Sequence, residues 1–297
     1  MKNDIKLLFE PRTIAVVGAS KDPKKIGNAV VKNILASGYA GKVYPINPSG
    51  DDVLGLRSYK DIGDLDGPVD MVCTTIPAKF VLDSAKHCAD LGAKYNVIIT
   101  SGFSEVGDIE TERKIVDYSL SRGTRVVGPN VFGVYSAVNN MDATFGPGNI
   151  LPGSVAIITQ SGALGLAMIG KTKVENIGLS AMVSIGNKAD VDEADMLGYL
   201  TEQKLTKVIF MYIEGIKDGP RFIEAVKKAT RKKPVVVIKS GRSERGAAAA
   251  ASHTGSLAGS DEIIEAILKQ NGVIRAENIQ EALNWAKYLA NSPAPTG

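Results

Sequence analysis

Short runs of β-branched and other apolar residues alternate with helical patterns over residues 12–139. The runs suited to strands are Thr13–Val17, Lys42–Ile46, Val69–Thr75, Tyr95–Thr100 and Arg125–Val127. Apolar residues at helical spacing fall between them, near Gly27–Ala36, Lys79–Leu91 and Ile109–Ser121. Strands and helices that alternate in this way form a parallel sheet covered by helices on both faces. The pattern therefore predicts an α/β domain over residues 1–139.

The same alternation returns after a stretch that has no periodicity. Glycine and proline interrupt residues 139–153, which is typical of a boundary, and we predict a linker over residues 140–153. Further strands are expected at Val155–Thr159, Leu179–Ser184, Lys207–Tyr212 and Pro234–Lys239. A second α/β domain is therefore predicted over residues 154–290, followed by a tail at 291–297.

The loops after the strands of the first domain carry its candidate chemistry. Ligands of open parallel sheets bind beyond the carboxyl ends of the strands. The loops at that edge are residues 18–27, 47–50, 74–77 and 100–103. The first of them places Lys21, Lys24 and Lys25 between Gly18 and Gly27. A loop of this composition after a strand indicates a phosphate-binding site, although a solvated lysine turn is the alternative.

The phosphate ligand that fits these loops is not NAD. The glycine spacing in residues 18–27 is not Gly-x-Gly-x-x-Gly. Residues 44–48, at the end of the second strand, offer no Asp or Glu to hold a ribose 2′-hydroxyl. Coenzyme A, with its diphosphate and 3′-phosphate, fits better, and an NAD-linked dehydrogenase is disfavoured.

Two motifs of the second domain lie where its strands end. The first strand runs into Gln160–Gly165 and then an apolar helix, so that backbone N–H groups of the glycine turn and the helix N-terminus are expected to bind an anion. A tight packing turn is the alternative. Glu214 follows the third strand and places a carboxylate at the same edge, although it also fits a strand that simply ends in water.

One of the two histidines, His253, lies among small residues in the stretch 241–259. Arg242 and Arg245 are close in sequence, and an apolar helical run begins at Leu257. A helix N-terminus attracts anions, and an unperturbed imidazole is a nucleophile near neutral pH. Phosphoryl transfer through His253 is therefore chemically reasonable, with an ordinary polar loop residue as the alternative. Glu214 is expected to fix the tautomer of this histidine.

Other polar groups are given structural roles. Asp190, Asp192, Glu193 and Asp195 form an acidic cluster that suits Mg²⁺, but a helix N-terminus explains the same residues more simply. We expect Cys73 to be a core thiol. His87 and Cys88 are expected on the surface of a helix.

Composition narrows the class of protein. Hydrophobic residues at 44% and charged residues at 23% describe an ordinary globular chain of 297 residues, which is long enough for two domains. The net charge of +3 is spread along the chain, which argues against nucleic acid as a partner. No apolar run is long enough for a membrane span, and residues 1–6 lack the apolar core of a signal peptide. A cytoplasmic location is the default expectation.

Seven blocks, in order, resemble those of the α subunits of nucleoside-diphosphate-forming acyl-CoA synthetases. They are Gly18–Ser20, Tyr44–Pro48, Thr100–Gly107, Gln160–Gly165, Gly186–Asp190, Tyr212–Gly215 and Ser252–Gly259. The last block is similar to the phosphohistidine segment of archaeal ADP-forming acetyl-CoA synthetases. The resemblance implies a Rossmann-like CoA-binding domain followed by a flavodoxin-like α/β domain.

The resemblance also implies residue roles. His253 would be phosphorylated and Glu214 would stabilise it. Ser161 and Gly162 would hold the travelling phosphate. The residues implied to contact CoA are Gly18, Ala19, Ser20, Lys21, Asn47, Thr100, Ser101 and Gly102.

The implied reaction is reversible. Phosphate attacks an acyl-CoA thioester, the resulting acyl phosphate phosphorylates His253, and the phosphoryl group passes to ADP. A small acid such as acetate is the implied product. Because the chain contains no ATP-grasp segment, ATP or ADP with Mg²⁺ would bind to an ATP-grasp β subunit, in an α2β2 heterotetramer.

Two departures from the family pattern matter. Val131 stands where the family often has cysteine, which leaves the histidine chemistry untouched. The sequence stops at Gly297, where many α chains continue, so either a natural subunit or a truncated piece is expected. A CoA-binding regulatory module without turnover is the competing function, and the presence of both His253 and Glu214 argues against it.

Overall fold

The computed structural model describes residues 5–241 and 261–292. The chain forms two compact units, the first from Met1–Ile150 and Val183–Asp192, the second from Leu151–Met182 and Glu193–Gly297. His253 lies outside the described residues. Within the described part of the chain, no helix is both long and apolar enough to cross a membrane.

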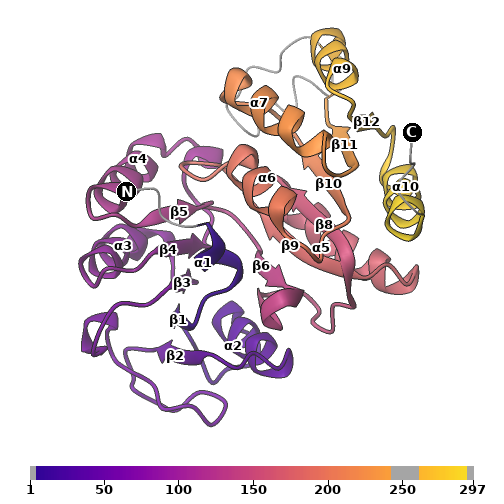
Figure 1. The fold of residues 1–297 in the computed structure, drawn as a ribbon. Helices are drawn as coiled ribbons and strands as arrows, with labels where there is room; N and C mark the ends of the chain where they lie inside the picture. The colour runs from indigo at the N-terminus through magenta and orange to yellow at the C-terminus, as the bar shows by residue number, and fades with distance from the viewer. Residues whose placement is uncertain (1–4, 242–260, 293–297) are drawn as a thin grey trace. The chain divides into compact units, whose positions relative to one another are not determined.

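The first unit is built on a five-stranded parallel sheet, drawn in indigo to magenta in Figure 1. Its strand order is β2-β1-β3-β4-β5. The strands are β1 Thr13–Val17, β2 Lys42–Ile46, β3 Met71–Thr74, β4 Tyr95–Ile98 and β5 Arg125–Val127. All five predicted strands are confirmed, although β3 begins two residues late and ends one early, and β4 ends two residues early. Most of their side chains are buried, as a sheet with two covered faces requires, and the exceptions lie mainly at the start of the edge strand β2.

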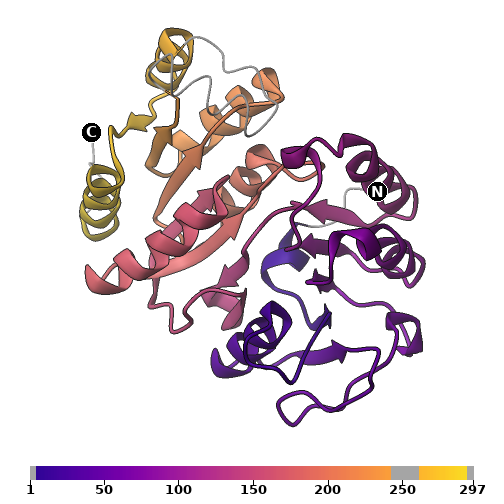
Figure 2. The same cartoon turned by 180° about the vertical axis from the view of Figure 1, so that it is seen from behind.

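Helices cover this sheet (Figure 2). They are α1 Lys6–Phe9, α2 Ile26–Ala36, α3 Val81–Asp90 and α4 Ile109–Ser121. Asp108 fixes the start of α4, because its carboxylate accepts the backbone N–H of Thr111 at 3.1 Å. The three longer helices confirm the predicted ones.

An antiparallel hairpin, β6 Gly133–Ser136 and β7 Met141–Thr144, completes the first unit and was not predicted. Strand β7 lies inside residues 140–153, the predicted linker. Asn33 on α2 ties the hairpin to the unit, since its Nδ2 donates to the carbonyl oxygens of Thr144 at 2.9 Å and Gly146 at 3.0 Å.

Residues 183–192 belong to the first unit, although the residues on either side of them belong to the second. The N–H of Ala189 donates to the Gly128 carbonyl at 2.9 Å. Arg125 Nε lies 2.8 Å from a carboxylate oxygen of Asp190, and the same oxygen accepts the N–H of Val126. Asp190 therefore accepts hydrogen bonds from an arginine side chain and from the backbone of strand β5.

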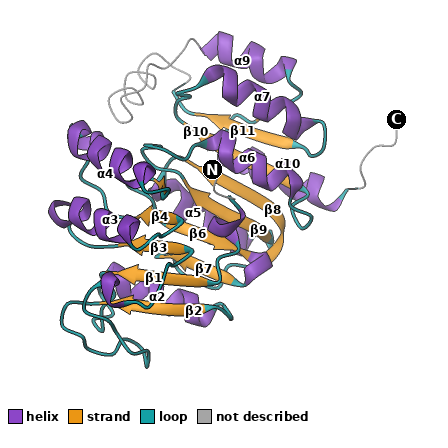
Figure 3. Cartoon of the chain, turned by 60° about the vertical axis from the view of Figure 1, so that its left-hand side comes forward, coloured by secondary structure: helices purple, strands orange, loops and turns teal. Residues whose placement is uncertain are grey.

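Five strands of the second unit are neighbours in the order β12-β11-β10-β8-β9, and the pairs β12–β11, β11–β10 and β10–β8 are parallel. Its strands are β8 Pro152–Thr159, β9 Leu179–Ser184, β10 Val208–Ile213, β11 Val235–Lys239 and β12 Ile274–Arg275. The strands are orange in Figure 3 and the helices purple. These helices are α5 Gly162–Val174, α6 Glu193–Glu202, α7 Gly219–Thr230, α9 Asp261–Gln270 and α10 Ile279–Asn291. The four predicted strands are confirmed, while β12 was not predicted.

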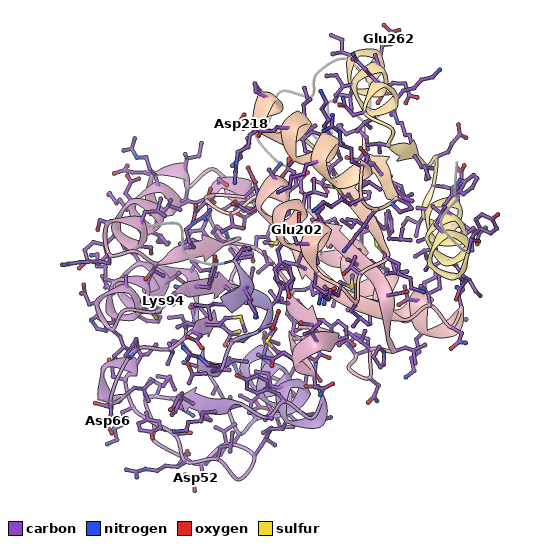
Figure 4. All side chains as sticks on the ribbon, in the orientation of Figure 1. Asp52, Asp66, Lys94, Glu202, Asp218 and Glu262 are labelled. Carbon is purple, nitrogen blue, oxygen red and sulfur yellow. The ribbon has the colours of Figure 1, made fainter. Side chains whose placement is uncertain are left out.

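Ion pairs connect α6 with α7. The guanidinium of Arg221 lies 2.6 Å from Asp195, the second acidic-cluster residue that contacts an arginine. Lys232, just after α7, lies 2.7 Å from Glu202, which is labelled in Figure 4. Among the described residues, no group of three or more His, Cys, Asp or Glu side chains could hold a metal ion.

Both cysteines are free thiols in the core. The expectation that Cys88 lies on a helix surface is wrong, because it is fully buried on α3. Burial raises the pKa of each thiol to about 12, so neither is a thiolate at neutral pH.

Asp142 on β7 is a buried carboxylate whose pKa is raised by burial. A folded-state pKa above the unfolded one destabilises the fold at pH values above the folded-state pKa, and this penalty vanishes below the unfolded value of about 3.9. Asp142→Asn keeps an oxygen to accept the Thr144 hydroxyl, 2.7 Å away. We expect the variant to match or exceed the wild-type melting temperature at pH 7, with the difference shrinking toward pH 4. A melting temperature several degrees lower at pH 7 would contradict this expectation.

Candidate active site

The connection between β1 and α2 is closely packed. Gly18 has φ +91°, in the left-handed region that favours glycine. Its N–H and that of Ala19 both donate to the Ile46 carbonyl, at 3.0 and 3.2 Å. A Cβ on Gly27 would lie 2.0 Å from the Gly18 carbonyl oxygen. The first turn of α2 therefore packs directly on the loop, and only glycine fits there.

The backbone N–H groups that this loop offers to a ligand begin at Ser20, not at Gly18. The N–H groups of Gly18 and Ala19 are engaged by the sheet. Within the described chain, no acceptor is present for the N–H groups of Ser20, Lys21, Ile26 or Gly27. Two belong to the loop and two to the start of an eleven-residue helix, where unpaired N–H groups favour an anion. This geometry is suited to an anionic group such as a phosphate.

Side chains around the loop are positioned as follows. Asn28 Nδ2 donates to the Ser20 carbonyl at 2.7 Å, which fixes the loop to α2. Lys21 pairs with Asp51 at 2.9 Å, and both side chains are largely exposed. An exposed ion pair contributes little to stability, so the Lys21 ammonium is free to leave Asp51 and contact a phosphate.

The other predicted contacts lie at the carboxyl ends of β2 and β4. Asn47 follows β2, and its Oδ1 accepts the N–H of Ser49 at 3.0 Å. Thr100 follows β4, and its hydroxyl donates to the Ile76 carbonyl at 2.7 Å. Ser101 is exposed, and Gly102 has φ +111°. The CoA-contact residues named from the sequence thus come from loops at one edge of one sheet, while their contacts with CoA stay predictions.

In the second unit, a side chain that was not singled out from the sequence connects the two predicted motifs. Gln160 is 6% exposed, and its Oε1 accepts the N–H groups of Glu214 at 2.5 Å and Gly215 at 3.1 Å. The next residue, Ser161, caps α5 by accepting the N–H of Leu164 at 3.3 Å. The buried amide of Gln160, the residue before Ser161, therefore fixes the backbone of Glu214 and Gly215 at the end of the neighbouring strand β10.

The start of α5 is suited to an anion. In the part of the chain that the structure describes, the N–H groups of Gly162 and Ala163 have no acceptor. Two open donors at the start of a thirteen-residue helix fit a phosphate.

The same edge also leads into the segment that contains His253. Strands β10 and β11 are parallel neighbours, and the Ser240 N–H donates to the Ile213 carbonyl at 2.9 Å. Glu214 and Ser240 thus leave the sheet side by side. Burial, with a smaller contribution from the negative charge of Glu214, raises the pKa of the Tyr212 phenol. The backbone at Glu214 therefore lies next to Ser240, two residues before the segment 242–260 begins.

Two family models match the two halves of the chain. A CoA-binding domain matches residues 12–137, and the flavodoxin domain of succinyl-CoA ligases matches residues 152–289. The α subunit of acetate–CoA ligase [ADP-forming] I from Pyrococcus furiosus is 48% identical over 99% of this chain. The chain belongs to the NDP-forming acyl-CoA synthetase family.

Other members of this family show how far the likeness extends. Acetyl-coenzyme A synthetase 1 of Ca. Korarchaeum cryptofilum, solved with phosphate and ADP, has a TM-score of 0.96 and 48% identity over 99% of this chain. The 4-hydroxybutyrate–CoA ligase [ADP-forming] of Nitrosopumilus maritimus is 39% identical over 97%. The chain spans 65% of the Pyrococcus subunit, 64% of the Korarchaeum chain and 42% of the Nitrosopumilus ligase.

Proposed function

We propose that this chain supplies the CoA-binding and phosphohistidine parts of an ADP-forming acetate–CoA ligase, in which acetyl-CoA, phosphate and ADP give acetate, CoA and ATP. The named relatives and the two matched domains support this activity. The observation that carries the proposal is the Gln160 amide, which holds Glu214 beside Ser161 at the edge where residues 242–260 begin.

In the first step, a phosphate oxygen attacks the thioester carbonyl carbon. The C–S bond breaks, the CoA thiolate takes a proton, and acetyl phosphate forms. The open N–H groups of Gly162 and Ala163 and the Ser161 hydroxyl stabilise the phosphate charge, since fixed donors at a helix start need little rearrangement.

In the second step, an imidazole nitrogen of His253 attacks the phosphorus atom. The P–O bond to the acyl group breaks and acetate leaves. The Glu214 carboxylate accepts a hydrogen bond from the other ring nitrogen and stabilises the positive charge that develops on the ring. The phosphoryl group then passes from His253 to ADP.

The nucleotide step needs a partner. Relatives of this chain are named α subunits, which implies a second subunit. We assign ATP, ADP and Mg²⁺ to an ATP-grasp β subunit in an α2β2 assembly in the cytoplasm. The acid is acetate or a similar small acid, because relatives are named for acetate and for 4-hydroxybutyrate.

Binding of CoA to the chain alone tests this proposal. Titration calorimetry is expected to show one CoA site in the micromolar range and no heat with NAD, since residues 44–48 provide no acidic residue for a ribose. Added salt should weaken the binding, because phosphate contacts are electrostatic. Binding of NAD without binding of CoA would overturn the proposal.

A further inference from the structure

The amide of Asn187 lies at the centre of a hydrogen-bond network in the first unit. Its Nδ2 donates to a carboxylate oxygen of Glu105 at 2.6 Å and of Glu112 at 2.8 Å. Its Oδ1 accepts from Asn130 Nδ2 at 3.4 Å, and its backbone N–H donates to the Pro129 carbonyl at 3.0 Å. These contacts determine which way the Asn187 amide faces.

The Glu105 carboxylate accepts hydrogen bonds from the backbone of the turn that precedes it. One carboxylate oxygen accepts the N–H of Gly102 at 2.5 Å, and the other accepts the N–H of Phe103 at 3.2 Å. Burial raises the pKa of Glu105, but the hydrogen bonds from Gly102 and Asn187 outweigh it, so the net pKa lies below the usual value. Glu105 is thus an ionised carboxylate seated on two successive backbone donors.

Glu112 is the second carboxylate at the amide of Asn187. It is 6% exposed and accepts the hydroxyl of Ser104 at 2.7 Å and its N–H at 3.2 Å. One carboxylate oxygen of Glu105 and one of Glu112 therefore face the same Asn187 amide nitrogen. Without the Asn187 donor, two carboxylates would face each other across a half-buried space, and like charges there repel.

The turn at Thr100–Gly102 needs such support. Gly102 has φ +111°, and glycine has more backbone freedom than other residues. Its restraints among the described residues include the Thr100 hydroxyl on Ile76, the Asn130 N–H on the Thr100 carbonyl at 3.0 Å, and Glu105. Two of these three restraints involve Asn130 or Glu105, which both contact Asn187.

We propose that Asn187 is a positioning residue for coenzyme A, which orients Glu105 and Asn130 and thereby fixes the Thr100–Gly102 turn in the form that binds the ligand. The inference rests on the proposed function, because it takes that turn as part of the CoA site.

Asn187 lies outside the matched CoA-binding domain that contains the Thr100–Gly102 turn. Residue 187 falls within the match to the flavodoxin domain, residues 152–289, yet residues 183–192 pack with the first unit. A residue that follows β9 therefore controls a turn of the CoA-binding domain. Sequence changes near residue 187 are expected to alter CoA affinity even though they lie outside the matched CoA-binding domain.

Two variants of Asn187 test the proposal in the full chain. Asn187→Ala removes the donor, and Asn187→Asp replaces it with a third carboxylate of the same shape. Leaving buried partners without a donor costs about 1–3 kcal/mol of free energy. If this whole cost opposes CoA binding, the affinity for CoA falls by about 5- to 150-fold. We expect the dissociation constant for CoA, measured by titration calorimetry, to rise at least fivefold, and further in Asn187→Asp.

A second readout separates positioning from general damage. Labelling of His253 by ³²P-acetyl phosphate needs neither CoA nor the partner, so its rate is expected to stay within twofold of wild type in Asn187→Ala. Asn139→Ala is the matched control, because it loses an Nδ2 bond of 2.8 Å to the Pro11 carbonyl, away from the turn. This control is expected to bind CoA like wild type.

The outcomes are distinguishable. Folded Asn187 variants that bind CoA within twofold of wild type would overturn the inference, as would an equal loss of CoA binding and labelling. If Asn187→Ala does not fold, Glu105→Gln is measured in its place. The new side chain faces either the Gly102 N–H or the Asn187 amide nitrogen with an NH2 group, where Glu105 offered an oxygen to each. The same outcomes apply. A wild-type chain that binds no CoA would overturn the proposed function, and the inference with it.

Discussion

Replacing His253 with alanine is expected to abolish phosphorylation of the chain while leaving CoA binding unchanged. In the proposed mechanism every phosphoryl group passes through one imidazole nitrogen of His253, so the substitution removes the nucleophile itself. Loss of a nucleophile typically reduces kcat by about 10³- to 10⁶-fold. Incubation with ³²P-acetyl phosphate is expected to give acid-labile, base-stable label on wild type and none on the variant.

The second histidine provides a matched control. His87 on α3 is 58% exposed at its side chain and lies 3.4 Å from Asp61, within the first unit. His87→Ala removes the same chemical group from the chain and is expected to label like wild type. Equal label on the His253→Ala and wild-type chains would exclude His253 as the phosphorylated residue.

The strands were predictable because fully buried parallel strands are short apolar runs bounded by turn residues. Residues 13–17 and 235–239 illustrate this, since their side chains are almost all buried and each run ends at a polar or glycine residue. Hairpin β6–β7 escaped prediction because its strands of four residues carry buried polar side chains, such as Ser136 and Asp142. The side chain of Asn33, more than one hundred residues away, accounts for part of its stability.

The division of the chain into units was harder to foresee. Nothing in the apolar pattern of residues 183–192 indicates that they pack with the first unit. Their placement depends on paired contacts such as Arg125 with Asp190, which are distant in sequence. Cys88 illustrates the same limit, because helical periodicity alone did not show which face of α3 is covered.

The sequence patterns predicted where the candidate site lies, but they did not predict the hydrogen bonds within it. Parallel strands bring the loops at 18–21, 47 and 100–102 to one edge, so their proximity followed from topology. Which N–H groups remain open did not follow, since Gly18 and Ala19 both donate to Ile46. The role of Gln160 was equally invisible, although its place directly before Ser161 marks it as a candidate in retrospect.

Gly27→Ala is the second change with a large expected effect. A Cβ there would lie 2.0 Å from the Gly18 carbonyl oxygen and 2.9 Å from the Thr75 hydroxyl oxygen, and real Cβ contacts are longer than 3.0 Å. Either α2 or the Gly18 loop has to move by about 1 Å, and overpacking of this kind costs about 1–3 kcal/mol of stability. The shift displaces the open N–H groups of Ser20 and Lys21 relative to those of Ile26 and Gly27.

We therefore expect Gly27→Ala to weaken CoA binding at least tenfold by calorimetry, because a phosphate held by several N–H groups requires all of them in register. Gly170→Ala is the matched control, since Gly170 lies within α5 and a Cβ there meets nothing within 4 Å. Alanine at such a helical position stabilises by roughly 0.5–1 kcal/mol. If both alanine variants bind CoA like wild type, the start of α2 does not hold the ligand. A selective loss in Gly27→Ala would support close packing of α2 on the Gly18 loop as the basis of CoA binding.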